Sequence, residues 1–240
     1  MVTHATEPTR PSVPTVVVVG AGPAGALSAL HLLRAARRRA GGVEVLLVDP
    51  ADRWGRGVAF GTAEDEHLLN VPAGAMSALP EDPGHFVAWL REHVRGDDAH
   101  EAAFVGRRTW GAYLDDTLRR TAVADVDGRT SVRHVLARVT GLREDEGGWV
   151  VHTETGDLAA DAVVVAAGLP GSEPTWAPDA LSGSPFFVRD PWRPGALDVV
   201  RRDRTGPADV LVVGSGLTGV DVVLTLTGAG NRPDRRVHVV

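Results

Sequence analysis

Two short glycine-rich runs have the spacing that binds the phosphates of a dinucleotide. They are residues 20–25 (GAGPAG) and residues 214–219 (GSGLTG). In a GxGxxG turn the first glycine permits a tight bend and the second lets the backbone approach a pyrophosphate. The third allows a helix to pack closely on a strand, and the amino terminus of that helix attracts the phosphate charge. Each run therefore predicts a dinucleotide site.

Asp49 supports this interpretation of the first run. It directly follows residues 43–48 (VEVLLV), a run typical of a buried strand, and a carboxylate at that place can accept hydrogen bonds from ribose hydroxyls. A glycine-rich turn without a ligand is therefore a weak alternative there. It is a stronger alternative for residues 214–219, because the ribose-binding residue would lie beyond the final residue. We expect Asp221, in the helix that follows, to be a packing or capping group rather than a catalyst.

Two further segments could contact a bound cofactor. Residues 162–168 (AVVVAAG) end in small residues that let a ligand approach the backbone, with a simple core strand as the alternative. Residues 52–70 form a long loop whose glycines permit unusual dihedral angles, and its Arg53 and Arg56 could meet phosphate oxygens. His67 in this loop could act as an acid or a base, but we favour a structural, hydrogen-bonding role.

The composition restricts the chemistry. There is no cysteine, which excludes disulfides, thiolate metal sites and redox-active dithiols within these residues, so redox chemistry must come from a bound cofactor. The formal net charge of -6 argues against a nucleic-acid surface, and no metal site is predicted. No run approaches the roughly 18 apolar residues that span a bilayer. Residues 1–14 lack the apolar core of a signal peptide, so we expect a disordered lead-in and a cytoplasmic protein that acts on a small molecule.

Apolar patterns predict the elements that position the two glycine runs. Residues 15–19 (TVVVV), 23–40 and 43–48 predict strand, helix and strand, which form a βαβ unit. The same order recurs near the end of the sequence, with a strand at 209–213, a helix at 217–228 and another strand from 237.

The intervening sequence predicts two helices and three strands. A helix begins at Asp82-Pro83, with Asp82 as N-cap, and buries Phe86, Val87 and Leu90. A second helix covers residues 109–123. Strands are predicted at residues 131–139, 149–154 and 162–166, the first two of them forming a small meander.

At this point a family resemblance is visible. Residues 55–90, GRGVAFGTAEDEHLLNVPAGAMSALPEDPGHFVAWL, resemble a group of bacterial FAD/NAD(P)-binding proteins in which GxGVAYxT, HLLNVPA, MSA and DPxxFxxWL recur in this order. Asp190-Pro191-Trp192 and residues 213–221 (VGSGLTGVD) are similar to the start of that group's second domain. The resemblance covers nearly the whole chain after Pro14. More distantly, the chain resembles flavin monooxygenases that hydroxylate amines and share the plan of two dinucleotide sites.

The resemblance implies binding roles for a set of positions. The FAD pyrophosphate would be held by Gly20, Gly22, Pro23, Ala24 and Gly25, and the adenosine ribose by Asp49. The pyrophosphate and ribityl chain would be covered by the segment that includes Arg53, Trp54 and Gly55. Leu69 and Asn70 would approach the flavin, and Val139, at the end of a meander strand, would contact adenine through its backbone. Ala167 and Gly168 would end the strand that leads to the nicotinamide domain. The NAD(P)H pyrophosphate would be bound by Gly214, Gly216, Leu217, Thr218 and Gly219.

The expected fold class is therefore α/β. A Rossmann-type FAD-binding domain, with a parallel sheet and a small β-meander, would occupy residues 15–170. Residues 171–208 would form a connection, and residues 209–240 the start of a second Rossmann domain for NAD(P). The family continues past this point, so we expect the sequence to be C-terminally truncated. Residues from about 206 to 240 would then be poorly packed or would lean their apolar face on the FAD domain, and in either case this chain would bind NAD(P)H weakly or not at all.

The expected function is that of an FAD-dependent oxidoreductase reduced by NAD(P)H, with N-hydroxylating monooxygenase as the most specific possibility. No residue is identified as a catalytic acid, base or nucleophile. A non-catalytic flavin- or nucleotide-binding module, or a degenerate fragment, is the alternative. A dehydrogenase that uses NAD alone is disfavoured by the second glycine run.

Overall fold

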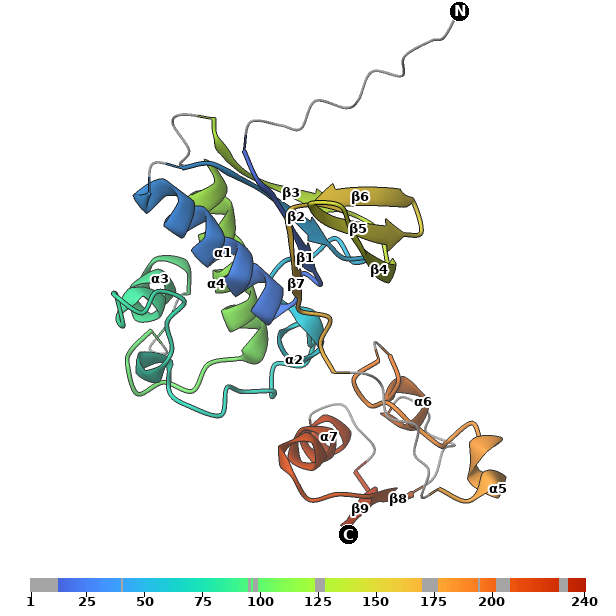
Figure 1. Ribbon diagram of the computed structural model, residues 1–240. Helices are drawn as coiled ribbons and strands as arrows, with labels where there is room; N and C mark the ends of the chain where they lie inside the picture. Colours follow the sequence, from blue (N-terminus) through green and yellow to red (C-terminus); the bar gives the residue numbers. More distant parts are fainter. Residues whose placement is uncertain are drawn as a thin grey trace, which may run out of the picture. The chain divides into compact units, whose positions relative to one another are not determined.

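The computed structural model describes residues 13–39, 41–94, 96, 99–123, 128–169, 177–193, 195–201, 208–228 and 233–240 (Figure 1). The predicted lead-in lies outside these residues except for its last two positions. The chain forms two compact units, one of residues 1–57 and 112–168 (unit 1) and one of residues 58–111 and 169–240 (unit 2). These units are defined by spatial contacts and differ from the sequence-based division, which stays a prediction.

Unit 1 is built on a four-stranded parallel sheet of the order β3-β2-β1-β7. Its strands are β1 (Thr15–Val19), β2 (Val43–Val48), β3 (Thr130–Val135) and β7 (Ala162–Val165). β1 lies in the middle, with Val17 paired to Leu46 of β2 and to Val163 of β7. The predicted βαβ unit and the α/β fold class are confirmed, and helix α1 (Pro23–Arg38) connects β1 to β2.

The two faces of this sheet are covered by different structures (Figure 1). α1 contacts the strands on one face, where Val18 lies against it. On the other face, Val17 and Val48 pack in a buried cluster with Val151 and Ala160 of a three-stranded antiparallel sheet. Alternate side chains of β1 thus enter two cores, which explains its continuous β-branched sequence.

The antiparallel sheet corrects one sequence-based prediction. It consists of β4 (Val139–Asp145), β5 (Gly148–Thr153) and β6 (Gly156–Ala160). The predicted strand at 131–139 is wrong as a single element, because β3 ends at Val135 and pairs with β2 in the parallel sheet. The N–H of Ala137 returns to the carbonyl of Val135 at 3.0 Å, so the chain turns without a glycine or proline to mark the change. Val139 therefore begins a meander strand instead of ending one.

Helix α4 (Arg107–Val123) begins in unit 2 and continues in unit 1. It starts two residues before the predicted helix and buries the expected Trp110, Tyr113, Leu114 and Leu118. None of the helices within the described ranges is long and apolar enough to span a bilayer.

The first part of unit 2 follows the short helix α2 (Gly57–Phe60) and contains the 3-10 turn η1 (Ala73–Ala75) and helix α3 (His85–His93). α3 buries the predicted Phe86, Val87 and Leu90, and the Phe86 ring meets Trp110 edge-on at 4.9 Å between centroids. The predicted start at Asp82 is wrong. The carbonyl of Asp82 accepts the N–H of His85 in a separate turn, and Gly84 takes the N-cap position.

The second part of unit 2 repeats the pattern of β1, α1 and β2. Short helices α5 (Asp179–Ser182) and α6 (Asp198–Arg201) precede β8 (Asp209–Val212), α7 (Leu217–Thr227) and β9 (Arg236–Val239). β8 and β9 pair in parallel as a two-stranded sheet. The strand–helix–strand order predicted from the sequence is confirmed to within one or two residues at each end.

Candidate dinucleotide sites

The first glycine turn lies at the carboxyl end of β1, beside the carboxyl ends of its parallel neighbours. The N–H of Gly20 donates to the carbonyl of Val48 at 2.8 Å, and the N–H of Ala21 donates to Oδ2 of Asp49 at 2.9 Å. The N–H of Gly55 reaches the carbonyl of Ala21 at 2.8 Å. Three segments that the sequence singled out are therefore brought together at the edge of the sheet where ligands of α/β proteins bind.

Two glycines of this turn are required by the protein itself. Gly20 has a φ of +99°, and a Cβ there would lie 2.4 Å from the carbonyl oxygen of Ala166. A Cβ on Gly25 would lie 1.8 Å from the carbonyl oxygen of Gly20. Neither position can hold a larger residue without moving backbone, so Gly20 permits the bend and Gly25 the close packing of α1.

Gly22 differs from these two glycines. Its φ of -64° and ψ of -172° are open to any residue, and among the described residues a Cβ would meet only the Cα of Gly57 at 3.6 Å, an ordinary contact. The fold therefore leaves the space above Gly22 free. This space fits the second-glycine role, in which the backbone approaches a pyrophosphate.

The start of α1 is also suited to a phosphate. Gly22 is the N-cap, Pro23 occupies the first turn, and no acidic side chain lies in that turn. Within the described part of the chain, no side chain caps this helix by a hydrogen bond. The first backbone N–H groups of the helix, which have no intrahelical partner, remain available to an anion.

Asp49 has hydrogen-bonding capacity left for a ribose. Its Oδ2 accepts from Ala21 and its Oδ1 accepts the N–H of Ala51 at 2.8 Å. Each carboxylate oxygen has two lone pairs, so one acceptor position on each is free of these two contacts. Its role as the ribose-binding residue stays a prediction, and the geometry is compatible with it.

Trp54 faces the protein, in contrast to the neighbouring exposed Arg53. The indole of Trp54 is buried, with the Arg119 guanidinium 4.4 Å from its ring centroid and the His134 ring edge-on at 6.0 Å. Neither Arg119 nor His134 is predicted as a neighbour of Trp54 from the sequence, because both come from distant elements. Trp54 thus anchors the loop whose Gly55 holds the glycine turn, and any contact of residues 53–55 with FAD stays a prediction.

The other predicted FAD contacts divide between the units. The N–H of Ala166 donates to the carbonyl of Val19 at 2.8 Å, and the backbone of Ala166 and Ala167 lies beside Gly20 of the glycine turn. Gly168 follows these two residues in the sequence. Leu69 and Asn70 belong to unit 2, where Leu69 is buried and its N–H donates to the carbonyl of Val105 at 2.9 Å. The proposed contacts of Leu69, Asn70 and Val139 with the cofactor stay predictions.

The second glycine turn has the geometry of the first. Gly214 has a φ of +109°, and its N–H donates to the carbonyl of Val240 at 2.8 Å. A Cβ on Gly219 would lie 2.2 Å from the carbonyl oxygen of Gly214. Gly216 is the N-cap of α7, with a φ of -72° and a ψ of -177°, and no atom of the described residues lies within 4 Å of a Cβ built on it. Leu217 and Thr218, which follow it, are exposed.

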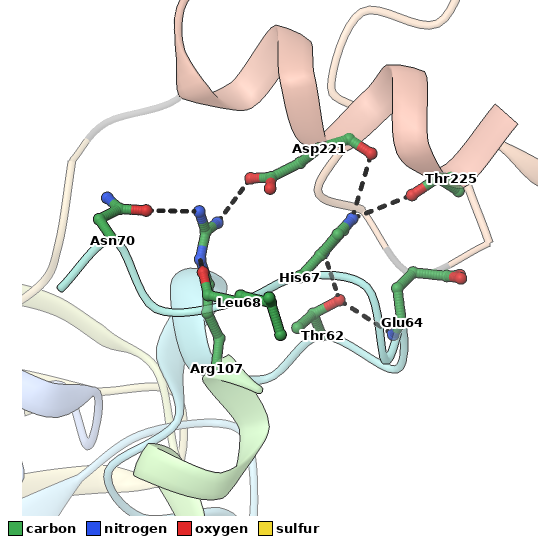
Figure 2. Close-up of polar contacts among 8 residues, drawn as sticks. All are labelled: Thr62, Glu64, His67, Leu68, Asn70, Arg107, Asp221 and Thr225. Atoms are coloured by element: carbon green, nitrogen blue, oxygen red, sulfur yellow. Dashed lines mark hydrogen bonds and ion pairs between the residues drawn. The ribbon is translucent and has the colours of Figure 1, made fainter. Parts of the chain in front are cut away.

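A buried polar cluster lies beside α7 in unit 2 (Figure 2). Nη1 of Arg107 pairs with Oδ2 of Asp221 at 2.6 Å, and His67 lies between Thr62 and Thr225. The structural role expected for His67 and the packing role expected for Asp221 both agree with these contacts. Arg107 itself was not predicted, since nothing in the sequence separates it from Arg108. Within the described residues, no group of His, Cys, Asp and Glu could hold a metal ion.

Comparison with protein families gives the family. Residues 17–170 match the FAD-NAD(P)-binding family, a match that includes the first glycine turn, Asp49 and the loop to Asn70. The chain belongs to this family. FAD and NAD(P)H are accordingly the cofactors of this FAD-NAD(P)-binding protein, and the residues of the first turn fit the pyrophosphate as described above. The matched region ends before the second turn.

Solved structures give the same fold for the FAD-NAD(P)-binding protein. L-lysine 6-monooxygenase from Pseudomonas syringae is 22% identical with a TM-score of 0.60, over 94% of this chain and 53% of that one. Bacillithiol disulfide reductase from Staphylococcus aureus is 13% identical with a TM-score of 0.58, over 95% and 56%. Lactococcus lactis thioredoxin reductase is 15% identical with a TM-score of 0.52, over 95% and 64%.

The chain thus spans between about half and two thirds of the length of these similar structures. At these identities the likeness establishes the fold alone. No curated protein matches the sequence.

Proposed function

We propose that this protein is an FAD-dependent oxidoreductase that NAD(P)H reduces. One observation supports this above the others: a single chain of the FAD-NAD(P)-binding family carries two glycine turns of the same geometry. The turn-forming glycines Gly20 and Gly214 have φ values of +99° and +109°, and the N-cap glycines Gly22 and Gly216 are both extended beneath open space. Two such turns suit two dinucleotides.

The protein's own residues bind and orient in this proposal. The open backbone at Gly22 and the start of α1 hold the FAD pyrophosphate, and Asp49 accepts hydrogen bonds from the ribose. Gly216 and the start of α7 do the same for NAD(P)H. FAD, when bound, supplies the electron-transfer chemistry that the side chains of this protein lack.

Within this class, we propose a monooxygenase that acts on a small amine. The absence of cysteine supports this choice, because a disulfide reductase working within these residues would need a thiol to exchange. The likeness in fold to a lysine monooxygenase points in the same direction. Primary amines such as lysine are therefore the first substrates to test, by following amine-dependent consumption of NADPH and oxygen.

The central test is anaerobic mixing of the FAD-loaded protein with NADH and, separately, NADPH. We expect one of them to bleach the yellow flavin absorbance. The Gly216→Val variant should keep its FAD and bleach much more slowly, because its side chain would fill the space above the second turn. A yellow protein that neither nucleotide bleaches would overturn the proposal and favour a non-catalytic flavin-binding module.

A further inference from the structure

Arg107 connects a loop of unit 2 to the helix that follows the second glycine turn (Figure 2). We propose that Arg107 is a positioning residue, which seats α7 so that the turn at its start can hold NAD(P)H. This inference rests on the proposed function. In this role Arg107 supports the nicotinamide site through α7 and does not itself touch the cofactor.

The guanidinium of Arg107 uses all three of its nitrogen atoms. Nη1 contacts Oδ2 of Asp221 at 2.6 Å, Nε donates to the carbonyl of Leu68 at 2.9 Å, and Nη2 donates to Oδ1 of Asn70 at 3.1 Å. The first contact is to α7, and the other two are to the loop. A planar guanidinium fixes the directions of these bonds, so the loop and the helix are held in one arrangement.

His67 makes a second link between the same two segments. Its Nε2 lies 2.9 Å from Oγ1 of Thr225 and 3.3 Å from the carbonyl oxygen of Asp221. Its Nδ1 lies 2.8 Å from Oγ1 of Thr62. A carbonyl can only accept, so the hydrogen assigned to the ring lies on Nε2 and the Thr62 hydroxyl donates to Nδ1.

The buried side of α7 is unusual for an apolar helix. Asp221 and Thr225, one turn apart, are buried together with Leu226, whereas Leu217, Val220 and Leu224 are exposed. Polar contacts therefore contribute to the seating of this helix beside the apolar contact of Leu226. A buried charge that loses its partner is strongly destabilising, so α7 is restricted to the position in which Asp221 meets Arg107.

Trp192 also packs against this cluster. This contact gives a role to the Asp190-Pro191-Trp192 motif, to which no cofactor contact is assigned. Its ring lies edge-on to His67, with 5.8 Å between the centroids, and the Arg107 guanidinium lies 5.8 Å from its centroid. Three segments thus meet around Arg107: residues 67–70 (HLLN), the Asp190-Pro191-Trp192 segment and the first half of α7. Asp221 is two residues beyond Gly219, so fixing Asp221 fixes the turn.

The test uses three variants, Arg107→Gln, Asp221→Asn and the double variant that combines both changes. Arg108→Gln is the control with which they are compared. Arg108 is the matched control, because it is adjacent and pairs with Asp65 at the surface, where the two side chains are 48% and 74% exposed. Each protein is measured for FAD content, for the half-maximal concentration of the nucleotide (NADH or NADPH) that bleaches the wild type, and for hydrogen exchange of the amides of α7 and β1.

We expect Arg107→Gln and Asp221→Asn each to raise the half-maximal concentration of that nucleotide by about tenfold, a typical coupling between linked sites. The α7 amides should exchange faster, with FAD content and β1 unchanged. The double variant should lose no more than either single variant, and Arg108→Gln should match the wild type. Since the double variant leaves no unpaired buried charge, it keeps the test valid where a single variant fails to fold.

Two negative outcomes are distinguishable. If neither NADH nor NADPH bleaches the wild type, the proposed function fails, and this inference fails with it. If NADH or NADPH bleaches the wild type and the Arg107 and Asp221 variants bleach at the same concentration of that nucleotide, only the inference is overturned. A loss of FAD in step with the loss of NADPH use would also contradict it, since Arg107 would then act as a general structural residue.

Discussion

Oδ2 of Asp49 accepts a hydrogen bond from the backbone N–H of Ala21 at 2.9 Å, so the end of β2 supports the turn at the end of β1. The carboxylate has two functions in this arrangement. It fixes the glycine turn through Ala21, and in the proposed function its remaining lone pairs accept hydrogen bonds from a ribose. Both functions predict that FAD binding depends on it.

We expect Asp49→Ala to weaken FAD binding at least tenfold. A hydrogen bond to a charged group contributes about 1.5 to 3 kcal/mol, and a tenfold loss corresponds to about 1.4 kcal/mol. Titration of the apoprotein with FAD gives the dissociation constant. Asp157→Ala is the control, because it removes the same charge from a side chain of the antiparallel sheet that is 60% exposed. An unchanged dissociation constant in Asp49→Ala would remove Asp49 from the site.

Gly22 and Gly25 should respond differently to a side chain. Alanine normally stabilises a helix relative to glycine by about 1 kcal/mol. Gly25→Ala should instead destabilise the protein by about 1 to 3 kcal/mol or more, because its Cβ would overlap the carbonyl oxygen of Gly20. The free energy of unfolding of Gly22→Val should lie within about 0.5 kcal/mol of the wild-type value, but the variant should purify without FAD.

Denaturant midpoints and the flavin-to-protein absorbance ratio measure these two effects separately. If Gly22→Val retains stoichiometric FAD, the pyrophosphate does not lie above Gly22. If Gly25→Ala is as stable as the wild type, α1 does not approach the turn as closely as the Gly25 and Gly20 backbones indicate.

Local signals accounted for most of the predicted elements. The β-branched run of β1 and the GxGxxG spacing depend on neighbouring residues alone, and the strand and the strand–turn–helix order that they predict are confirmed. The boundary between β3 and β4 was missed because strand pairing is non-local. Leu136 continues the apolar pattern of β3, yet it is exposed, since the chain leaves the parallel sheet at Val135.

The buried cluster of unit 2 had no local signal at all. Arg107 and Asp221 are 114 residues apart, and Arg107 stands beside an arginine of the same type whose side chain is exposed. Only the tertiary structure shows which of the two is buried. His67 was correctly expected to be a hydrogen-bonding residue, but its partners Thr62 and Thr225 could not be named from the sequence.

Asp209 predicts a pH-dependent contact between β8 and β9. Its Oδ1 lies 3.1 Å from Nε2 of His238 and 2.9 Å from Nε of Arg236. The hydrogen bond from His238, and then the pairing with Arg236, lower the pKa of Asp209 from its ordinary value of 3.8. The folded state binds the carboxyl proton of Asp209 less tightly than the unfolded state. The ionised carboxylate therefore stabilises the strand pair fully above pH 3.8, and this contribution is lost as the pH falls through the lowered pKa.

An NMR titration of the Asp209 carboxyl carbon should therefore give a midpoint below 3.8. His238→Gln should move that midpoint back toward 3.8. Asp145 is the internal control: its pKa is lowered by Arg143 and by the N–H of Glu146, so it should not respond to His238→Gln. A midpoint of Asp209 at or above 3.8 in the wild type would show that the contact does not form in solution.

The two glycine turns should also differ in local stability. β1 has β2 and β7 as neighbours, and the side chains of Val17 and Val18 are fully buried. β8 has β9 as its neighbour in a two-stranded sheet, and Leu211 and Val213 are 61% and 52% exposed. Burying one such side chain contributes about 1.5 to 3 kcal/mol. Amides of residues 210–212 should therefore exchange at least about tenfold faster than those of residues 16–19, after correction for intrinsic rates.

Hydrogen exchange of the FAD-loaded monomer, followed residue by residue, measures this difference. The amides of residues 45–47 in β2 are the control and should be protected like those of β1, since these side chains are equally buried. Addition of NADPH should slow exchange around β8 and α7 and leave β1 unchanged, because a ligand that binds only the folded form stabilises the segment that holds it. Equal protection of β1 and β8 before any nucleotide is added would show that β8 is covered in solution. Unchanged protection of β8 and α7 after addition would show that the second turn does not hold NADPH.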